Sequence, residues 1–227
     1  MSSKRDGSRV NEPGKADLQS EKRTAPLSGP NSRWARPVVL ENDLLRLEPL
    51  SVRHADDLYQ FGSDERLWKY TTQPPFKSLE EVEVWIERTL QEVSEGRQVA
   101  FTIVGKGWGQ AVGSTRFFEI RPHHSALEIG YTWLGKASQG TGINSMAKYL
   151  LLEHCFEKLN AVRVQFKTDV RNLPSRKALE KIGAREEGFL RRHMLLWNGH
   201  RRDTVIYSII EDEWPRVKTR LLKLIKN

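Results

Sequence analysis

The stretch Trp133-Leu-Gly-Lys-Ala-Ser-Gln-Gly-Thr-Gly-Ile-Asn144 decides the fold, because it joins two segments of different periodicity. The β-branched and aromatic residues of 127–134 indicate a strand that ends inside it. A strand that passes through glycines into a helix presents backbone N–H groups at the positive end of the helix dipole. The stretch therefore predicts a phosphate site. The helix that follows is indicated by apolar residues at helical spacing: Ile143, Met146, Ala147, Leu150, Leu151 and Cys155.

The loop at 139–142 also has a simpler interpretation, since glycines allow a strand to turn into a helix without any ligand. It has no Gly-Lys-Ser/Thr, which would supply a lysine and a magnesium ligand, and no three-glycine dinucleotide fingerprint. If the loop binds phosphate, we expect a ligand that carries a pyrophosphate and needs no magnesium chemistry.

The composition is that of an ordinary globular chain. Its 227 residues, 38% of them hydrophobic, have room for one domain with appendages and a real core. No apolar run reaches the roughly 18–20 residues of a membrane span. The single cysteine, Cys155, favours a reducing, cytoplasmic home, and we expect it to be a buried small hydrophobe. The six histidines show no zinc spacing, so we expect no metal.

The net charge of +8 invites a nucleic-acid interpretation, but half of the excess lies in residues 1–36. No known nucleic-acid motif is present, and we expect no nucleic-acid partner. The strongest local clusters, Arg191-Arg192 and Arg201-Arg202, suit an anionic cofactor or an acidic partner equally well.

The order of the patterns predicts a flexible basic tail at 1–36 and one α+β domain at 37–227. Helices are expected after Ser51, Ser78, the glycine loop and Asn172, and at the end of the chain. The strand–helix–strand order within 127–168 favours a parallel strand pair in a mixed sheet. The expected strands are 38–40, 44–47, 99–104, 111–120, 127–134, 161–168, 189–197 and 202–210.

Four motifs in this order resemble the GCN5-related N-acetyltransferase superfamily, and within it the RimJ/RimL-type ribosomal-protein acetyltransferases. They are Glu128-Ile-Gly-Tyr131, Gln139-Gly-Thr-Gly142, Asn172-Leu-Pro-Ser175 and Ala178-Leu-Glu-Lys-Ile-Gly-Ala184. The resemblance spans about residue 37 to the end. It implies a three-layer acyl-CoA N-acyltransferase fold: a mostly antiparallel central sheet, a splayed parallel strand pair and flanking helices.

The resemblance also implies acetyl-CoA as the acyl donor, which is a co-substrate. The backbone of the glycine loop matches the family's pyrophosphate cradle, the end of the central strand matches the segment that pairs with the pantetheine arm, and the Asn-x-x-Ser motif meets the donor beyond the thioester. The residues expected to bind the donor are Thr132, Trp133, Leu134, Gln139, Gly140, Thr141, Gly142, Ile143, Asn144, Asn172 and Ser175.

Transfer of an acetyl group to an amine needs a base, a stabilised oxyanion and a proton for the leaving thiolate. Glu128 is the candidate base; the alternative is a structural ion pair with one of the arginines. Strand alternation places Leu127, Ile129, Tyr131 and Trp133 on one face, and Glu128 on the other with Gly130 and Thr132. Ser175 is the candidate proton donor, although a serine there also suits a helix cap. A backbone N–H of the central strand would meet the oxyanion.

The acceptor site is expected between the two early helices and the last hairpin. A protein N-terminus is the first choice of acceptor, and a polyamine, amino acid or aminoglycoside the second. The alternative class is a non-catalytic acyl-CoA-binding or nucleic-acid-associated module, and both monomer and homodimer stay open. The candidate lining residues, each of which also suits a core position, are Trp68, Tyr70, Phe76, His193 and Trp197.

Overall fold

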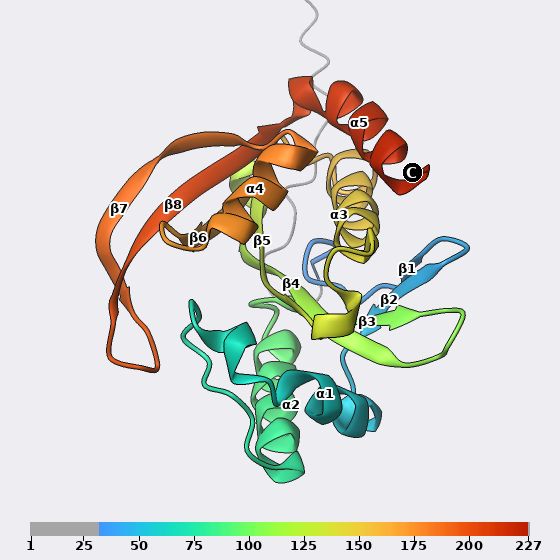
Figure 1. Ribbon diagram of the computed structural model, residues 1–227. Helices are drawn as coiled ribbons and strands as arrows, with labels where there is room; N and C mark the ends of the chain where they lie inside the picture. Colours follow the sequence, from blue (N-terminus) through green and yellow to red (C-terminus); the bar gives the residue numbers. More distant parts are fainter. Residues whose placement is uncertain (1–31, 227) are drawn as a thin grey trace, which may run out of the picture.

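The computed structural model describes residues 32–226, so 1–31, most of the expected tail, lie outside the described residues. One twisted sheet carries helices on both of its faces (Figure 1). Its eight strands follow the order β1-β2-β3-β4-β5-β6-β8-β7. They are β1 (Leu40–Glu41), β2 (Leu45–Pro49), β3 (Val99–Gly105), β4 (Ala111–Arg121), β5 (Ala126–Leu134), β6 (Arg163–Asp169), β7 (Arg185–Leu195) and β8 (Arg201–Ile210).

Only β5 and β6 pair in parallel, and every other neighbouring pair in this sheet is antiparallel. The predicted mixed sheet and its parallel pair are therefore confirmed. The parallel pair is joined by α3 (Ile143–Glu153), which continues into a π-helical turn at His154–Lys158. This crossover is what brings the glycine loop to the end of β5.

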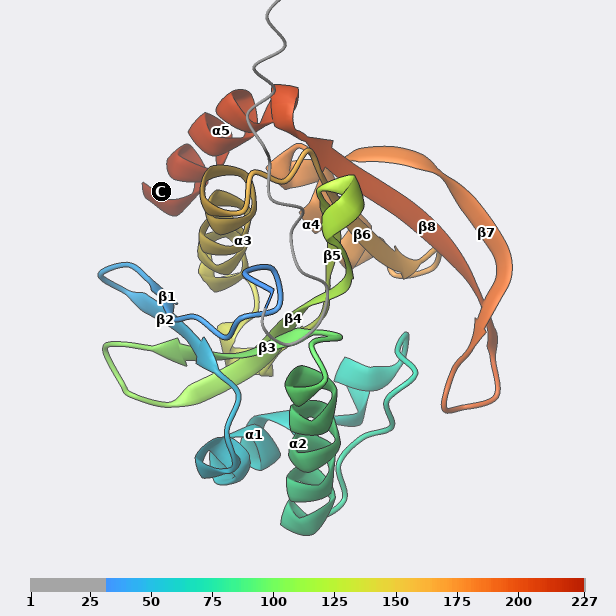
Figure 2. The ribbon, with the colours of Figure 1, turned by 180° about the vertical axis from the view of Figure 1, so that it is seen from behind.

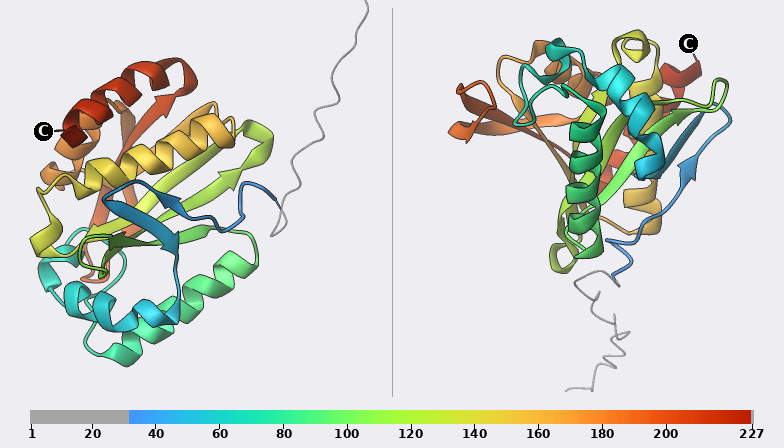
Figure 3. Two further views of the ribbon diagram at one scale, coloured as in Figure 1. Left: turned by 90° about the vertical axis from the view of Figure 1, so that its right-hand side faces the viewer. Right: turned by 90° about the horizontal axis from the view of Figure 1, so that it is seen from below.

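The helices form two separate layers, one on each face of the sheet (Figures 2 and 3). On one face lie α1 (Ala55–Gly62) and α2 (Leu79–Ser94). On the other lie α3, α4 (Leu173–Ile182) and α5 (Trp214–Lys226). Two apolar cores correspond to these layers. The main core, under α3 to α5, contains Phe101, Phe117 and Tyr207, and the second core, under α1 and α2, contains Trp68 and Trp133.

Local signals begin and end the helices where the sequence predicts. The Ser78 hydroxyl accepts a hydrogen bond from the Glu81 N–H at 3.2 Å and begins α2. Asn172 begins α4 in the same way, because its Oδ1 accepts from the Ser175 N–H at 3.2 Å. Gly183 ends α4 in the left-handed conformation with φ of 100°.

The boundary between tail and domain is drawn too late at residue 36. Trp34 and Ala35 are only 2% and 1% exposed, and Trp34 belongs to the main core. One indole buries enough apolar surface to offset the ordering of its short segment, which the polar composition around it conceals.

Two truncations separate the tail from this anchor. Removal of 1–31 keeps Trp34 and is expected to leave the melting temperature within a few degrees of that of the full chain. Removal of 1–36 empties the indole site and is expected to cost about 3–5 kcal/mol of unfolding free energy, as for Trp→Ala changes in cores. Thermal and urea unfolding measure both. Equal stabilities of the two truncated chains would show that Trp34 contributes nothing.

A β-bulge in β5 changes which side chains share a face. Ser114 pairs with Trp133 and Arg116 with Gly130, so that two residues of β5 face one of β4. Tyr131 takes the extra place with φ of 50°. The predicted alternation across 127–133 is therefore wrong beyond Gly130: Ile129 packs in the main core, whereas Trp133 packs in the second. The bulge turns Thr132 away from the face of Glu128 and toward α3.

Candidate active site

The parallel strands separate soon after they meet. Backbone pairing joins only Ala126–Glu128 of β5 to Arg163–Gln165 of β6. Beyond this point β5 pairs only with β4, and β6 only with β8. The facing backbone edges of 129–134 and 166–169 are thus left without a strand between them, and an extended chain can pair with such edges. The strand–helix–strand order of the sequence predicts the parallel pair. The strands splay because their backbone pairing covers only three residues of each strand.

The glycine loop lies at the open end of this splay. Gly140 and Gly142 have φ of 80° and 87°, and a Cβ on either would meet no atom within 4 Å. The first helical hydrogen bond of α3 runs from the Met146 N–H to the Gly142 carbonyl at 3.0 Å. Within residues 32–226, the N–H groups of 140–145 donate to no backbone carbonyl. These unpaired donors and the open space before them fit a pyrophosphate.

Two side chains of the loop hold its shape. The Gln139 amide donates to the Leu134 carbonyl at 3.0 Å, and the Thr141 hydroxyl donates to the Ser138 carbonyl at 2.8 Å. Both were expected to bind the donor, and the structure places their polar groups on the loop's own backbone. The backbone of the loop is thus free to face a ligand while the side chains fix its curvature.

Substitution of Gly142 by Val tests the loop. A β-branched residue at positive φ costs about 1–3 kcal/mol of strain, and the loop relieves it by moving its N–H groups. We expect the Kd for CoA, measured by calorimetry, to rise at least about tenfold, the equivalent of ~1.4 kcal/mol. Gly109→Val is the matched control, because Gly109 also has positive φ and open space but lies in the β3–β4 turn. An unchanged Kd in Gly142→Val would place the phosphates elsewhere.

Asn172 and Ser175 lie just after the end of β6, at the N-terminus of α4. The Asn172 Oδ1 is occupied by the helix cap, whereas its amide N–H₂ donates to no group within the described residues. The Ser175 hydroxyl is half-buried and, within the same residues, has no hydrogen-bond partner. Both residues were predicted to contact the acyl donor. Each borders the end of the splay and has one polar group available to a ligand, the amide of Asn172 and the hydroxyl of Ser175.

Glu128 is the last residue of β5 that pairs with β6, and it is 1% exposed. Its Oε2 accepts from the Gln165 amide at 3.0 Å and forms an ion pair with the Lys167 ammonium at 2.8 Å. The ion-pair alternative thus has a partner, which is a lysine of β6 and not an arginine. Within 32–226 no hydrogen bond is made by Oε1, so one carboxylate oxygen stays available to an amine or a water.

A row of polar side chains begins at Glu128 and continues along β6. Gln165, Lys167 and Asp169 alternate with the core residues of β6 and share the face of Glu128. Asp169 is fully buried and paired with Arg171 at 2.8 Å. Glu128 is the one residue of this row that the sequence motifs mark as a candidate for the chemistry. The alternation of core and polar residues in 163–169 is the signal that could have placed Lys167 and Asp169 on the same face.

His193 joins the row through a wide bulge in β7. Leu190 pairs with Thr204 and Met194 with Arg202, which leaves extra residues of β7 between them. The ring Nδ1 of His193 lies 3.1 Å from the Thr204 hydroxyl. Burial and the positive charges of Lys167 and Arg202 lower the pKa of His193. A neutral imidazole at pH 7 follows from that direction.

Of the other predicted lining residues, two are core residues and two border the site. Trp68 and Phe76 are buried in the second core with ring centroids 5.1 Å apart, so their side chains support the site from inside. Tyr70 follows the 3-10 helix η2 (Glu65–Trp68), and the Arg171 guanidinium lies 5.6 Å from its ring. The Trp197 indole donates to the Trp68 carbonyl at 2.9 Å, which ties the tip of the last hairpin to this segment.

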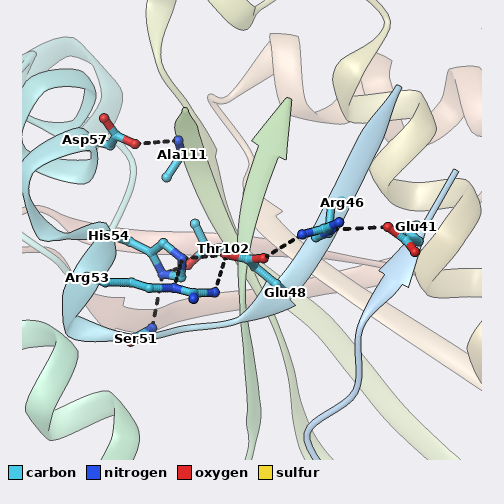
Figure 4. A network of polar contacts seen from close by, with 9 residues as sticks. All are labelled: Glu41, Arg46, Glu48, Ser51, Arg53, His54, Asp57, Thr102 and Ala111. Atoms are coloured by element: carbon cyan, nitrogen blue, oxygen red, sulfur yellow. Dashed lines mark hydrogen bonds and ion pairs between the residues drawn. The ribbon is translucent and has the colours of Figure 1, made fainter. Parts of the chain in front are cut away.

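A second polar network lies around the start of α1 (Figure 4). The imidazole of His54 lies 2.7 Å from a Glu48 oxygen and 2.9 Å from the Thr102 hydroxyl. Burial works against ionisation of Glu48, but His54 and Arg53 outweigh it and lower the pKa of that carboxyl. The arrangement resembles a catalytic relay, yet Thr102 is fully buried and inaccessible to a substrate. We assign the network to the attachment of α1 to β2 and β3.

Residues 32–226 contain no group of three or more His, Cys, Asp or Glu side chains that could hold a metal ion. None of the helices in the same range is both long and apolar enough to cross a membrane.

The mixed sheet with its splayed parallel pair and glycine loop defines the acyl-CoA N-acyltransferase class of folds. The family model of the GNAT acetyltransferase domain matches residues 45–185, and the chain belongs to this family. It is therefore an acetyltransferase by family, and acetyl-CoA is the donor that the family implies.

The chain is similar to several known proteins, among them the following three. An uncharacterised N-acetyltransferase, p20, of Bacillus licheniformis is 29% identical over 176 residues, which cover 78% of this chain and 98% of that protein. The putative ribosomal N-acetyltransferase YdaF of Bacillus subtilis is 40% identical over 110 residues, 48% of this chain and 59% of that protein. RimJ of Mycobacterium smegmatis, solved in complex with CoA-disulfide, has the same fold with a TM-score of 0.73 at 23% identity, covering 83% and 95% of the two chains.

Proposed function

We propose that this protein transfers the acetyl group of acetyl-CoA to a primary amine by direct attack of the amine at the β5–β6 splay. The observation that carries the proposal is the combination along this splay: unpaired loop N–H groups for the pyrophosphate at its open end, and a buried carboxylate, Glu128, at the point where the strands part. The first binds the donor and the second serves the acceptor.

The donor is held mainly by backbone. The N–H groups of 140–145 take the pyrophosphate, and the free edge of β5 from 129 to 134 pairs with the pantetheine arm. The amide of Asn172 and the hydroxyl of Ser175, which border the end of the splay, are the side-chain groups that we assign to the donor beyond the thioester. Among the expected side chains, Gln139 and Thr141 act by shaping the loop.

The chemistry uses three positions around the splay. Glu128 takes a proton from the ammonium of the acceptor, directly or through a water on its free Oε1. The amine nitrogen then bonds to the carbonyl carbon, and a backbone N–H next to the β5 bulge meets the oxyanion. When the carbon–sulfur bond breaks, the Ser175 hydroxyl gives its proton to the thiolate and takes up the second proton of the attacking nitrogen. The acceptor ammonium thus loses two protons, one to Glu128 and one through Ser175 to the thiolate, so that a neutral amide and the CoA thiol form without a covalent enzyme intermediate.

A protein N-terminus is the acceptor that we propose first. YdaF, the relative of 40% identity, carries the description ribosomal N-acetyltransferase. The acceptor side is bordered by Tyr70 and by the hairpin tip at Trp197, whose indole donates to the Trp68 carbonyl at 2.9 Å. A small amine is the second candidate. A reducing compartment, the cytoplasm, agrees with one buried free cysteine.

Thiol release from acetyl-CoA, followed over a panel of amines, tests this proposal. The panel contains peptides with free N-termini, their N-acetylated counterparts, lysine-containing peptides, amino acids, polyamines and aminoglycosides. We expect thiol release together with an acetylated product, identified by mass, for at least one amine. Tight binding of CoA without thiol release from any amine would instead show a non-catalytic acyl-CoA-binding module.

A further inference from the structure

Within the described residues 32–226, Arg202 is a buried arginine without a partner. It is 8% exposed, its Nε is enclosed without a hydrogen bond, and no group within 32–226 accepts from its guanidinium. Arg116 provides the contrast, because it is equally buried at 7% but donates to Gln98 at 3.1 Å and Thr89 at 3.0 Å. A buried guanidinium costs several kcal/mol in desolvation unless an anion or good acceptors meet it.

The carboxylates near Arg202 are already paired with other cations. Glu128 is bound by Lys167 at 2.8 Å and Asp169 by Arg171 at 2.8 Å. Burial lowers the pKa of Arg202, and the negative charges of Asp169 and Glu128 oppose that shift without reversing it. The cluster of three cations and two carboxylates therefore keeps one positive charge in excess. The neutral His193 adds none.

Arg202 also lies on the correct face for the acceptor. Val205, Tyr207 and Ile209 of β8 pack in the main core, so Arg202 and Thr204 project to the opposite face, that of Glu128. The same arginine influences His193, a predicted acceptor-lining residue, electrostatically. An acceptor whose amine lies at Glu128 could therefore place an anionic group of its own next to the Arg202 guanidinium.

We propose that Arg202 binds a carboxylate of the acceptor, so that the preferred substrate is an amine with a carboxylate close to it. This inference rests on the proposed function and narrows it: polyamines and aminoglycosides, which carry further positive charge, are excluded. The carboxylate has two sources, the α-carboxylate of a free amino acid or an acidic side chain within the first residues of a peptide. The planar guanidinium fork suits either, because it donates two parallel hydrogen bonds to one carboxylate.

Matched pairs of acceptors test the proposal. One pair is serine and serinamide; the others are short peptide amides with Glu or Gln at the first, second or third position. Rates are divided by the fraction of free amine. In the native protein we expect the carboxylate member of at least one pair to have a kcat/KM about 10–100 times higher. The pair that shows the preference identifies the source.

Two variants assign the preference to the guanidinium. Arg202→Met should remove the preference by lowering kcat/KM for the carboxylate member alone, and Arg202→Lys should restore part of it, since lysine keeps the charge but loses the fork. Arg201→Met is the control, because Arg201 is exposed and precedes Arg202 on the strand, so that the net charge changes equally. Melting temperature and CoA affinity verify folding in each.

Equal kcat/KM within every pair in the native protein, or a preference that survives Arg202→Met, would overturn the carboxylate site. The comparison of native pairs needs no variant, so poor folding of Arg202→Met leaves the test intact. Absence of thiol release with every amine would instead overturn the proposed function on which the site rests.

Discussion

Glu128→Gln is expected to lower kcat/KM by about 10²–10³-fold at pH 7, in the range of general-base catalysis. The amide keeps the size of the side chain and a hydrogen bond to Gln165, but it cannot take a proton. Because the fraction of neutral amine rises with pH, we expect the loss to shrink as the pH approaches the pKa of the acceptor. Kinetics from pH 6.5 to 9.5 with one peptide acceptor give this profile.

The variant Glu187→Gln separates catalysis from structure. Glu187 of β7 also forms an ion pair, with Arg163 at 2.5 Å, but it is exposed, and its carboxylate contacts Arg163 and Ser208 and not Glu128. Its substitution should leave kcat/KM within about threefold, as for most exposed ion pairs, whose contribution is small. If Glu128→Gln also changes kcat/KM by less than threefold while stability falls, the buried carboxylate has only the structural role that its pairing with Lys167 permits.

Lys148→Met is expected to stabilise the protein at neutral pH. Lys148 of α3 is 5% exposed and donates to the Thr132 hydroxyl at 2.8 Å, and burial lowers its pKa from 10.5 to about 7. At 1.36 kcal/mol per pKa unit, this difference corresponds to a cost on the order of 4–5 kcal/mol for keeping the ammonium in the folded state. Methionine fills similar volume without that charge.

The sign of the pH dependence follows from the lowered pKa. Below about pH 7 the lysine is charged in both states, and the full cost is present. As the pH rises toward the unfolded value of 10.5, the unfolded state loses its proton too and the cost disappears. The native protein should therefore gain stability from this group between these values, whereas Lys148→Met should not. Denaturant unfolding at pH 6, 8 and 10 measures the difference.

Lys218→Met is the control variant, because its expected change in stability has the opposite sign. Lys218 of α5 pairs with Glu157 at 2.7 Å and Glu153 at 3.1 Å, and these contacts raise its pKa. Its removal should lower stability slightly at neutral pH. Unfolding curves of Lys148→Met that show lower stability than the native protein at pH 6 would mean that the hydrogen bond to Thr132 is worth more than the desolvation of the ammonium.

Local periodicity was sufficient for the order of elements in 37–226 and for the parallel pair. Alternating and helical apolar patterns report burial directly, and caps such as Asn172 report a helix start through one side chain. The bulge in β5 left no such trace, because Tyr131 has positive φ where glycine would be the usual signal. One inserted residue was enough to reverse the faces of Thr132 and Trp133.

The site was less accessible to sequence reasoning than the fold. Glu128 and the loop lie within motifs, but the partners of Glu128 come from β6, and the unpaired state of Arg202 depends on where Asp169 and Arg171 meet. Such pairings are set by tertiary contacts between distant residues. Lys148 illustrates the same limit, since a lysine within an apolar helix face is ordinarily expected to reach solvent.

Hydrogen exchange of the backbone with and without CoA tests the proposed donor site most directly, because the donor is proposed to bind backbone N–H groups. CoA is expected to slow exchange at two separate segments, the free edge of β5 at 129–134 and the loop and first helical turn at 140–145. Exchange in the Glu48–His54 region should stay unchanged. Protection confined to other segments, or no protection at saturating CoA, would contradict the placement of acetyl transfer at the splay.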